Sequence, residues 1–65
     1  MEIHFAENLK KLRKQYKVTQ TYLGDCVGVS QRAISHYEDK NAEPSVETLA
    51  KIADFFGISI DELVK

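Results

Sequence analysis

The sequence predicts an all-α fold, a compact bundle of five short helices that forms one domain over residues 1–65. Apolar residues recur at intervals of three and four along most of the chain, and no segment alternates with the period of two that a half-buried strand requires. Residues that favour helix starts precede these segments, and glycines follow two of them. A chain of 65 residues has room for one small domain, which excludes most enzymes.

The first helix is predicted over roughly residues 3–16. Its apolar residues recur at i, i+4, i+7 and i+11, which places them in one stripe, and the lysines between them fall on the opposite side. The stripe comprises Phe5, Leu9, Leu12 and Tyr16. We expect this stripe to face the core.

A short second helix follows, with Thr19 as its N-cap and Gly28 as the left-handed residue that ends it. We expect it to bury Leu23, Cys26 and Val27. Cys26 is then a small apolar residue of the core rather than the exposed thiolate that a redox sensor requires.

The third helix starts almost at once, because only Val29 separates Gly28 from the next N-cap candidate, Ser30. It is predicted to run to about Asp39. On a helical wheel, three less polar residues fall on one side and hydrogen-bonding residues fall on the other. The first set is Ala33, Ile34 and Tyr37, and the second set is Gln31, Arg32, Ser35, His36 and Asp39.

Two further helices complete the predicted bundle. Ser45, directly after the single proline, caps a fourth helix that Gly57 ends. Ser59 and Glu62 have the spacing of a capping box, which predicts a last short helix. The apolar residues of these helices are Leu49, Ile52, Ala53 and Phe56 in the fourth and Ile60, Leu63 and Val64 in the fifth.

The composition argues against several classes of site and of protein. One cysteine cannot form an internal disulfide, and His4 and His36 lie in different helices without a cluster of metal ligands around them. We therefore expect no metal, no cofactor and no catalytic group. No apolar stretch is long enough to span a membrane, and the first residues lack the pattern of a secretion signal. The expected location is the cytoplasm, where the thiol stays reduced.

The formal net charge of −1 is the sum of two unlike halves. Residues 1–32 carry +3, and residues 33–65 carry −4. Such an asymmetry is compatible with a local basic face, and the charge of that face governs contact with phosphates. A solvated helix without any partner explains the same pattern.

The polar side of the third helix suits the major groove of DNA. Arginine can bond guanine through two hydrogen bonds, glutamine can do so with adenine, and shorter side chains serve either base. A two-turn helix, a tight turn and a helix with a polar outer face form a helix-turn-helix, here over about residues 19–39. Gln31 and Arg32 stand at the N-terminal positions that point toward the bases in such motifs. The two helix starts can hold phosphates, through Thr19, Gln20 and Ser30.

Several short motifs extend over nearly the whole chain, and the spacing between them is specific. They are Leu9 to Arg13, Val18 to Gln20, Leu23, Gly28 to Ser30, Ile34-Ser35, Tyr37-Glu38, Pro44-Ser45 and Leu49 to Leu63. In these motifs the chain closely resembles the lambda-repressor-like helix-turn-helix family, the Cro and xenobiotic-response-element type of bacterial and phage regulators. The resemblance implies a five-helix bundle and a transcriptional regulator, expected to be a repressor, that binds double-stranded operator DNA as a two-fold homodimer.

The resemblance also implies roles for single residues. It pairs Arg13 with Glu38 as a structural clamp between helices. The positions that match groove-facing residues of the family are Gln31, Arg32, Ser35 and His36. The positions that match its phosphate contacts are Gln20, Lys40 and Asn41.

Three positions depart from the family pattern. The family often has glycine after its first and third helices, where this chain has Lys17 and Lys40 or their neighbours, so these turns are expected to differ or to be mildly strained. Gly24 stands where the family usually has alanine. A small residue at this position lets the second and third helices approach closely.

Apolar residues near the C-terminal end leave two explanations open. Phe55, Ile58, Ile60 and Val64 are candidates for a dimer interface, and they could instead close the small core. The competing function is a protein-interaction module on the same fold, whose apolar patch holds a partner such as a toxin or another regulator. A DNA-binding antitoxin would satisfy both functions.

Overall fold

The computed structural model describes residues 4–65 and confirms the all-α prediction, because every regular element within this range is a helix. The predicted first helix began at residue 3, which lies outside the described residues. The first helix of the structure begins at Phe5 and ends at Gln15. The five helices are α1 (Phe5–Gln15), α2 (Gln20–Val27), α3 (Gln31–Asp39), α4 (Val46–Phe56) and α5 (Ile60–Val64).

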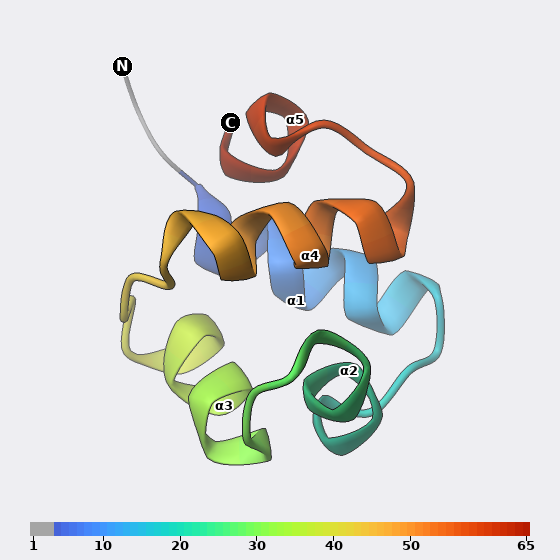
Figure 1. Cartoon of the computed structure of the whole chain (residues 1–65), viewed down its shortest axis with the longest axis vertical. Helices are drawn as coiled ribbons and strands as arrows, with labels where there is room; N and C mark the ends of the chain where they lie inside the picture. The colour runs from blue at the N-terminus through green and yellow to red at the C-terminus, as the bar shows by residue number, and fades with distance from the viewer. Residues whose placement is uncertain (1–3) are drawn as a thin grey trace.

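The helices are arranged in three levels along the longest axis of the molecule (Figure 1). α5 and the C-terminus lie at one end, α1 and α4 occupy the middle, and α2 and α3 lie at the opposite end (Figure 1). Two hydrogen bonds join the start of α1 to α5, from the His4 N–H to the Val64 carbonyl at 2.7 Å and from the Asn8 amide to the Leu63 carbonyl at 3.0 Å. The fold therefore separates the α2–α3 pair from the start of α1 and from the C-terminus.

The core is centred on one fully buried aliphatic side chain from each helix. These residues are Leu9, Leu23, Ile34, Ile52 and Leu63. Each helix therefore depends on the helices packed against it to keep its central side chain out of water. Burial of one such side chain stabilises the fold by roughly 1.5–3 kcal/mol.

The predicted N-caps are confirmed at four helix starts. The side chains of Thr19, Ser30, Ser45 and Ser59 each accept a hydrogen bond from the backbone N–H three residues later. Ser59 and Glu62 form the predicted capping box. The predicted left-handed ends are confirmed as well, since φ is 81° at Gly28 and 69° at Gly57. These local signals set the helix boundaries.

Gly24 lies where the backbone of α2 meets the turn before α3. A Cβ atom at this position would be 2.6 Å from the Val29 carbonyl oxygen, closer than real Cβ contacts allow. The Gly24 carbonyl also accepts hydrogen bonds from the N–H groups of Gly28 and Val29, at 2.8 and 2.9 Å. The absence of a side chain thus permits the close approach that the sequence predicted.

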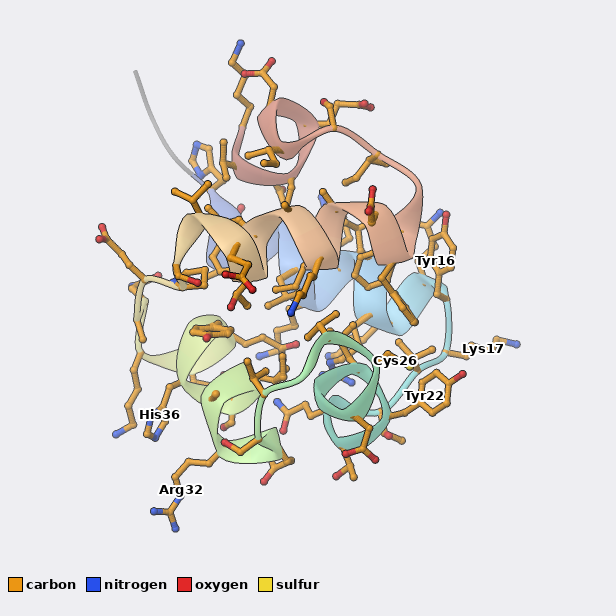
Figure 2. The ribbon with its side chains drawn as sticks, in the orientation of Figure 1. Tyr16, Lys17, Tyr22, Cys26, Arg32 and His36 are labelled. Carbon is orange, nitrogen blue, oxygen red and sulfur yellow. The ribbon has the colours of Figure 1, made fainter. Side chains whose placement is uncertain are left out.

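The prediction that Cys26 is buried is wrong, because the structure exposes this side chain. Leu23 and Val27, four residues apart, mark the inner side of α2, and Cys26 lies about 100° around the helix from Val27. It faces outward with Tyr22, one turn earlier (Figure 2). The Tyr22 pKa is raised by its hydrogen bond to Cys26.

Tyr16, the last residue of the predicted apolar stripe, is 51% exposed rather than buried. It follows the last residue of α1, and its ring packs edge-on against Phe56 with 5.2 Å between centroids. Its hydroxyl donates to the Phe56 carbonyl at 3.5 Å. A ring packed on an aromatic neighbour and a hydroxyl bonded to a carbonyl at a helix end suit a half-exposed tyrosine.

Within residues 4–65, two non-glycine residues adopt the left-handed conformation, at the turns where strain was expected. They are Lys17, after α1, with φ of 58°, and Asn41, after α3, with φ of 52°. Asparagine tolerates this conformation better than lysine does, because its short side chain can bond locally. The strain is therefore greater at Lys17.

We expect Lys17→Gly to be more stable than Lys17→Ala by about 1 kcal/mol, because glycine alone removes the steric cost of positive φ. Both variants remove the charge and the long aliphatic chain of the lysine, so the alanine variant is the matched control. Urea denaturation followed by circular dichroism measures the difference. Equal stabilities would show that the Lys17 turn stores no strain.

Candidate nucleic-acid interface

α2 and α3 form a helix-turn-helix joined by residues 28–30. Gly28 turns the chain in its left-handed conformation, and Ser30 starts α3 with its side chain bonded to the Ala33 N–H at 3.0 Å. The outer side of α3 lies at the end of the molecule opposite α5, and the labelled Arg32 and His36 point outward from it (Figure 2). The motif thus presents α3 at the edge of the molecule.

The four predicted base-reading residues share this outer side of α3. Gln31 and Arg32 are exposed, and Ser35 and His36 are partly exposed. Ser35 is already engaged, because its hydroxyl donates to the Asp39 carboxylate at 3.3 Å. Arg32 is exposed and its side chain points away from the bundle (Figure 2).

An acidic residue adjoins the outer side of α3, and a basic side chain nearby compensates its negative charge. Asp39 lies 3.5 Å from the Lys10 ammonium, which reaches it from α1, and it also accepts the Ser35 bond. Sequence reasoning missed this pairing, because Lys10 and Asp39 are distant in sequence. The basic residue of α1 reduces the repulsion between Asp39 and a phosphate backbone.

The predicted phosphate contacts occupy two places. Thr19 and Ser30 cap α2 and α3 with their oxygen lone pairs, which leaves each hydroxyl hydrogen available to donate to an anion. Lys40 and Asn41 are exposed in the loop after α3. Gln20 is half-buried, and its amide is directed to two other side chains rather than outward.

The expected pairing of Arg13 with Glu38 is present as a nearly water-free ion pair. Arg13 donates from Nε to Glu38 Oε2 at 2.7 Å and from Nη2 to Oε1 at 3.0 Å, and its Nη1 donates to the Val18 carbonyl at 3.1 Å. The Glu38 side chain is 0% exposed and that of Arg13 is 15% exposed. The hydrogen bond to Glu38 raises the Arg13 pKa above its ordinary value, so the guanidinium stays charged.

Two glutamines extend this ion pair to the surface. Gln20 donates from Nε2 to Glu38 Oε1 at 3.1 Å, and Gln31 donates from Nε2 to Gln20 Oε1 at 2.6 Å. Gln20 and Gln31 are the first residues of α2 and α3. Sequence reasoning missed this bridge, although the two helix starts of the motif were a signal that the glutamines could meet.

Comparison with known proteins agrees with this geometry. The helix-turn-helix family model matches residues 9–63. The chain belongs to the lambda-repressor-like helix-turn-helix family. It is 43% identical over 61 residues to YqaE of Bacillus subtilis, an uncharacterized HTH-type transcriptional regulator, and this match covers 94% of the chain and 53% of YqaE. The chain thus spans about half the length of that relative.

Two solved structures of this helix-turn-helix family share the fold closely. A transcriptional regulator from Listeria innocua superposes with a TM-score of 0.92 at 33% identity, over 98% of this chain and 60% of that one. The P22 c2 repressor, crystallised with a synthetic operator, superposes with a TM-score of 0.88 at 38% identity, over 94% and 92% of the two chains. The relatives of this chain include bacterial regulators and phage repressors.

Most of the four residues predicted as candidates for a dimer interface pack against other residues of this helix-turn-helix domain. Ile58 and Val64 pack partly buried against the core. Phe55 is half-buried and packs its ring on Tyr22 and Phe56, with centroids 6.2 and 5.0 Å apart. Ile60, at 38% exposed, is the candidate that leaves the most surface for a second copy.

Other site types find little support in residues 4–65. No group of three or more His, Cys, Asp and Glu side chains in this range is placed to hold a metal ion. None of the helices described has the length and apolar character needed to cross a membrane.

We expect Arg13→Met to lower the free energy of unfolding by about 3–5 kcal/mol, because it leaves the Glu38 carboxylate buried without its cation. The double variant Arg13→Met/Glu38→Leu removes both charges and should lose clearly less. Urea denaturation of both variants measures the contrast. A double variant as unstable as the single one would mean that packing, rather than the buried charge, causes the loss.

Proposed function

We propose that this chain is a sequence-specific DNA-binding transcriptional regulator, a repressor, that inserts α3 into the major groove of its operator. Residues 1–65 act as one DNA-binding domain around the helix-turn-helix core of about residues 19–39. The observation that carries the proposal is the outward N-terminal half of α3, with Gln31 and Arg32 exposed on a motif shared with an operator-binding repressor. This function requires no cofactor, metal or catalytic group.

The base contacts follow from the hydrogen-bonding groups of α3. Arg32 suits guanine, whose O6 and N7 accept two bonds from one guanidinium. Gln31 suits adenine, which offers one donor and one acceptor. Ser35 and His36, one turn further along the helix, contact neighbouring bases.

The phosphate contacts flank these readers. The start of α2 offers backbone N–H groups and the Thr19 hydroxyl to one phosphate, and the start of α3 offers the Ser30 hydroxyl. Lys40 and Asn41 contact the backbone from the loop after α3, and Gln20 retains one amide hydrogen for a phosphate. These contacts fix the register of α3 in the groove without reading sequence.

The regulator acts as a two-fold homodimer. Two copies of α3 then enter successive major grooves on one side of the duplex, with half-sites about 34 Å apart. Ile60 and its neighbours Phe55, Ile58 and Val64 are the proposed contact surface. The second copy doubles the number of base contacts, which favours a symmetric operator.

Selection of bound sequences from a random duplex pool at near-physiological salt tests this function. We expect a two-fold symmetric site to be enriched, and the enrichment to be lost in the Gln31→Ala/Arg32→Ala variant. Weak binding without any enriched sequence would contradict operator reading. It would favour instead a protein-interaction module that binds a toxin or another regulator.

We expect Arg32→Ala to lose about 1–3 kcal/mol of binding free energy and to relax the preference at one operator position. Lys40→Ala is the matched control, since loss of a phosphate contact weakens all sequences equally and lowers the salt slope by about 1. Fluorescence anisotropy on duplexes that differ at single base pairs measures both effects. A uniform loss for Arg32→Ala would make Arg32 a phosphate contact.

A further inference from the structure

We propose that Asp39 is a positioning residue that makes the Ser35 hydroxyl an acceptor toward DNA, and that Ser35 thereby selects bases with an amino group in the major groove. The proposal rests on the proposed function, in which Ser35 meets a base. It narrows the choice at one operator position to adenine and cytosine. The evidence is the pair of contacts that joins Ser35 to Asp39 and Asp39 to Lys10.

Asp39 is an acid in a place that disfavours acids. It is the last residue of α3, one turn after Ser35 and on the same side of the helix. The C-terminal end of a helix carries a partial negative charge, which repels a carboxylate. The proposed ligand is a polyanion, which repels it as well. A role in base reading accounts for a carboxylate at this position despite both costs.

Each oxygen of the Asp39 carboxylate has its own partner. Oδ1 lies 3.5 Å from the Lys10 ammonium, and Oδ2 lies 3.3 Å from the Ser35 hydroxyl. Lys10 belongs to α1, so it holds the carboxylate from outside α3. A carboxylate in an ion pair accepts hydrogen bonds and donates none. The single hydroxyl hydrogen of Ser35 therefore points to Asp39.

The consequence is that Ser35 offers DNA only an acceptor. A free serine hydroxyl can donate or accept, so it serves any base. With its hydrogen on Asp39, Ser35 presents only lone pairs. Adenine and cytosine carry amino groups in the major groove, at N6 and N4, which can donate to this oxygen. Guanine and thymine carry the carbonyl oxygens O6 and O4 instead, which would face the lone pairs of Ser35 with no hydrogen between them.

The test begins by locating the base pair that Ser35 reads, as the position whose preference changes in Ser35→Ala. Fluorescence anisotropy then compares four duplexes that differ only at this pair, for the wild type and for Asp39→Ala. Alanine cannot accept from Ser35, so the hydroxyl hydrogen is released and can donate to O6 or O4. We expect the preference for adenine and cytosine over guanine and thymine at this pair to fall about fivefold, the effect of one hydrogen bond.

Two comparisons separate positioning from the loss of a charge and from direct base contact. Asp25→Ala removes an exposed acid from the other helix of the motif, and it should change no base preference. In the Ser35→Ala background, Asp39→Ala should raise affinity for all duplexes alike, because a negative charge is lost and the hydroxyl that Asp39 positions is absent. The Asp39 side chain is 52% exposed, so its loss leaves the core intact, and circular dichroism checks the fold of each variant.

An unchanged preference at the Ser35 pair in Asp39→Ala would overturn the proposal and leave Asp39 as a charge that only repels phosphates. A change that persists in the Ser35→Ala background would overturn it too, because Asp39 would then contact a base itself. So would a wild type that prefers guanine or thymine at this pair, or a Ser35→Ala variant with unaltered base preferences. These outcomes leave operator reading by the rest of α3 intact. A wild type that selects no sequence would instead overturn the proposed function itself.

Discussion

The buried ion pair between Arg13 and Glu38 is the interaction on which the rest of the structure depends. Arg13 comes from the last turn of α1, Glu38 comes from the last turn of α3, and a third bond from Arg13 holds the Val18 carbonyl before α2. A carboxylate without exposure to water is tolerated only when it is paired and hydrogen-bonded. The pair therefore fixes the orientation of α3 relative to the middle of the bundle. The five aliphatic core residues alone define this orientation less precisely.

Much of the fold could be predicted because its signals are local. Thr19, Ser30, Ser45 and Ser59 bond backbone groups three residues away, and Gly28 and Gly57 act through their own φ angles. Such signals can be recognised within a short stretch of sequence. The outer side of α3 was predictable for a similar reason, since helical periodicity alone places Ile34 inward and Arg32 outward. Family resemblance added the pairing of distant residues, above all Arg13 with Glu38.

The remainder depended on contacts that no local pattern records. α2 has only eight residues, too few for periodicity to separate Cys26 from its buried neighbours Leu23 and Val27. The bridge from Glu38 through Gln20 to Gln31 joins residues 18 and 11 positions apart. The C-terminal apolar residues were ambiguous because a small core and a dimer surface require the same residue types. The structure packs Ile58 and Val64 against the core and leaves part of each side chain exposed.

The distribution of acids explains how a chain with a net charge of −1 can approach a polyanion. Near α3, Glu38 is neutralised by Arg13 inside the protein, and Asp39 lies beside Lys10. Asp61 and Glu62 belong to α5, at the opposite end of the molecule (Figure 1). The field at each end is set by nearby charges, because salt screens charges beyond about 8–10 Å. In the proposed function a phosphate backbone meets the exposed Arg32 at the end of the molecule opposite Asp61 and Glu62, where Asp25 is the exposed acid of α2.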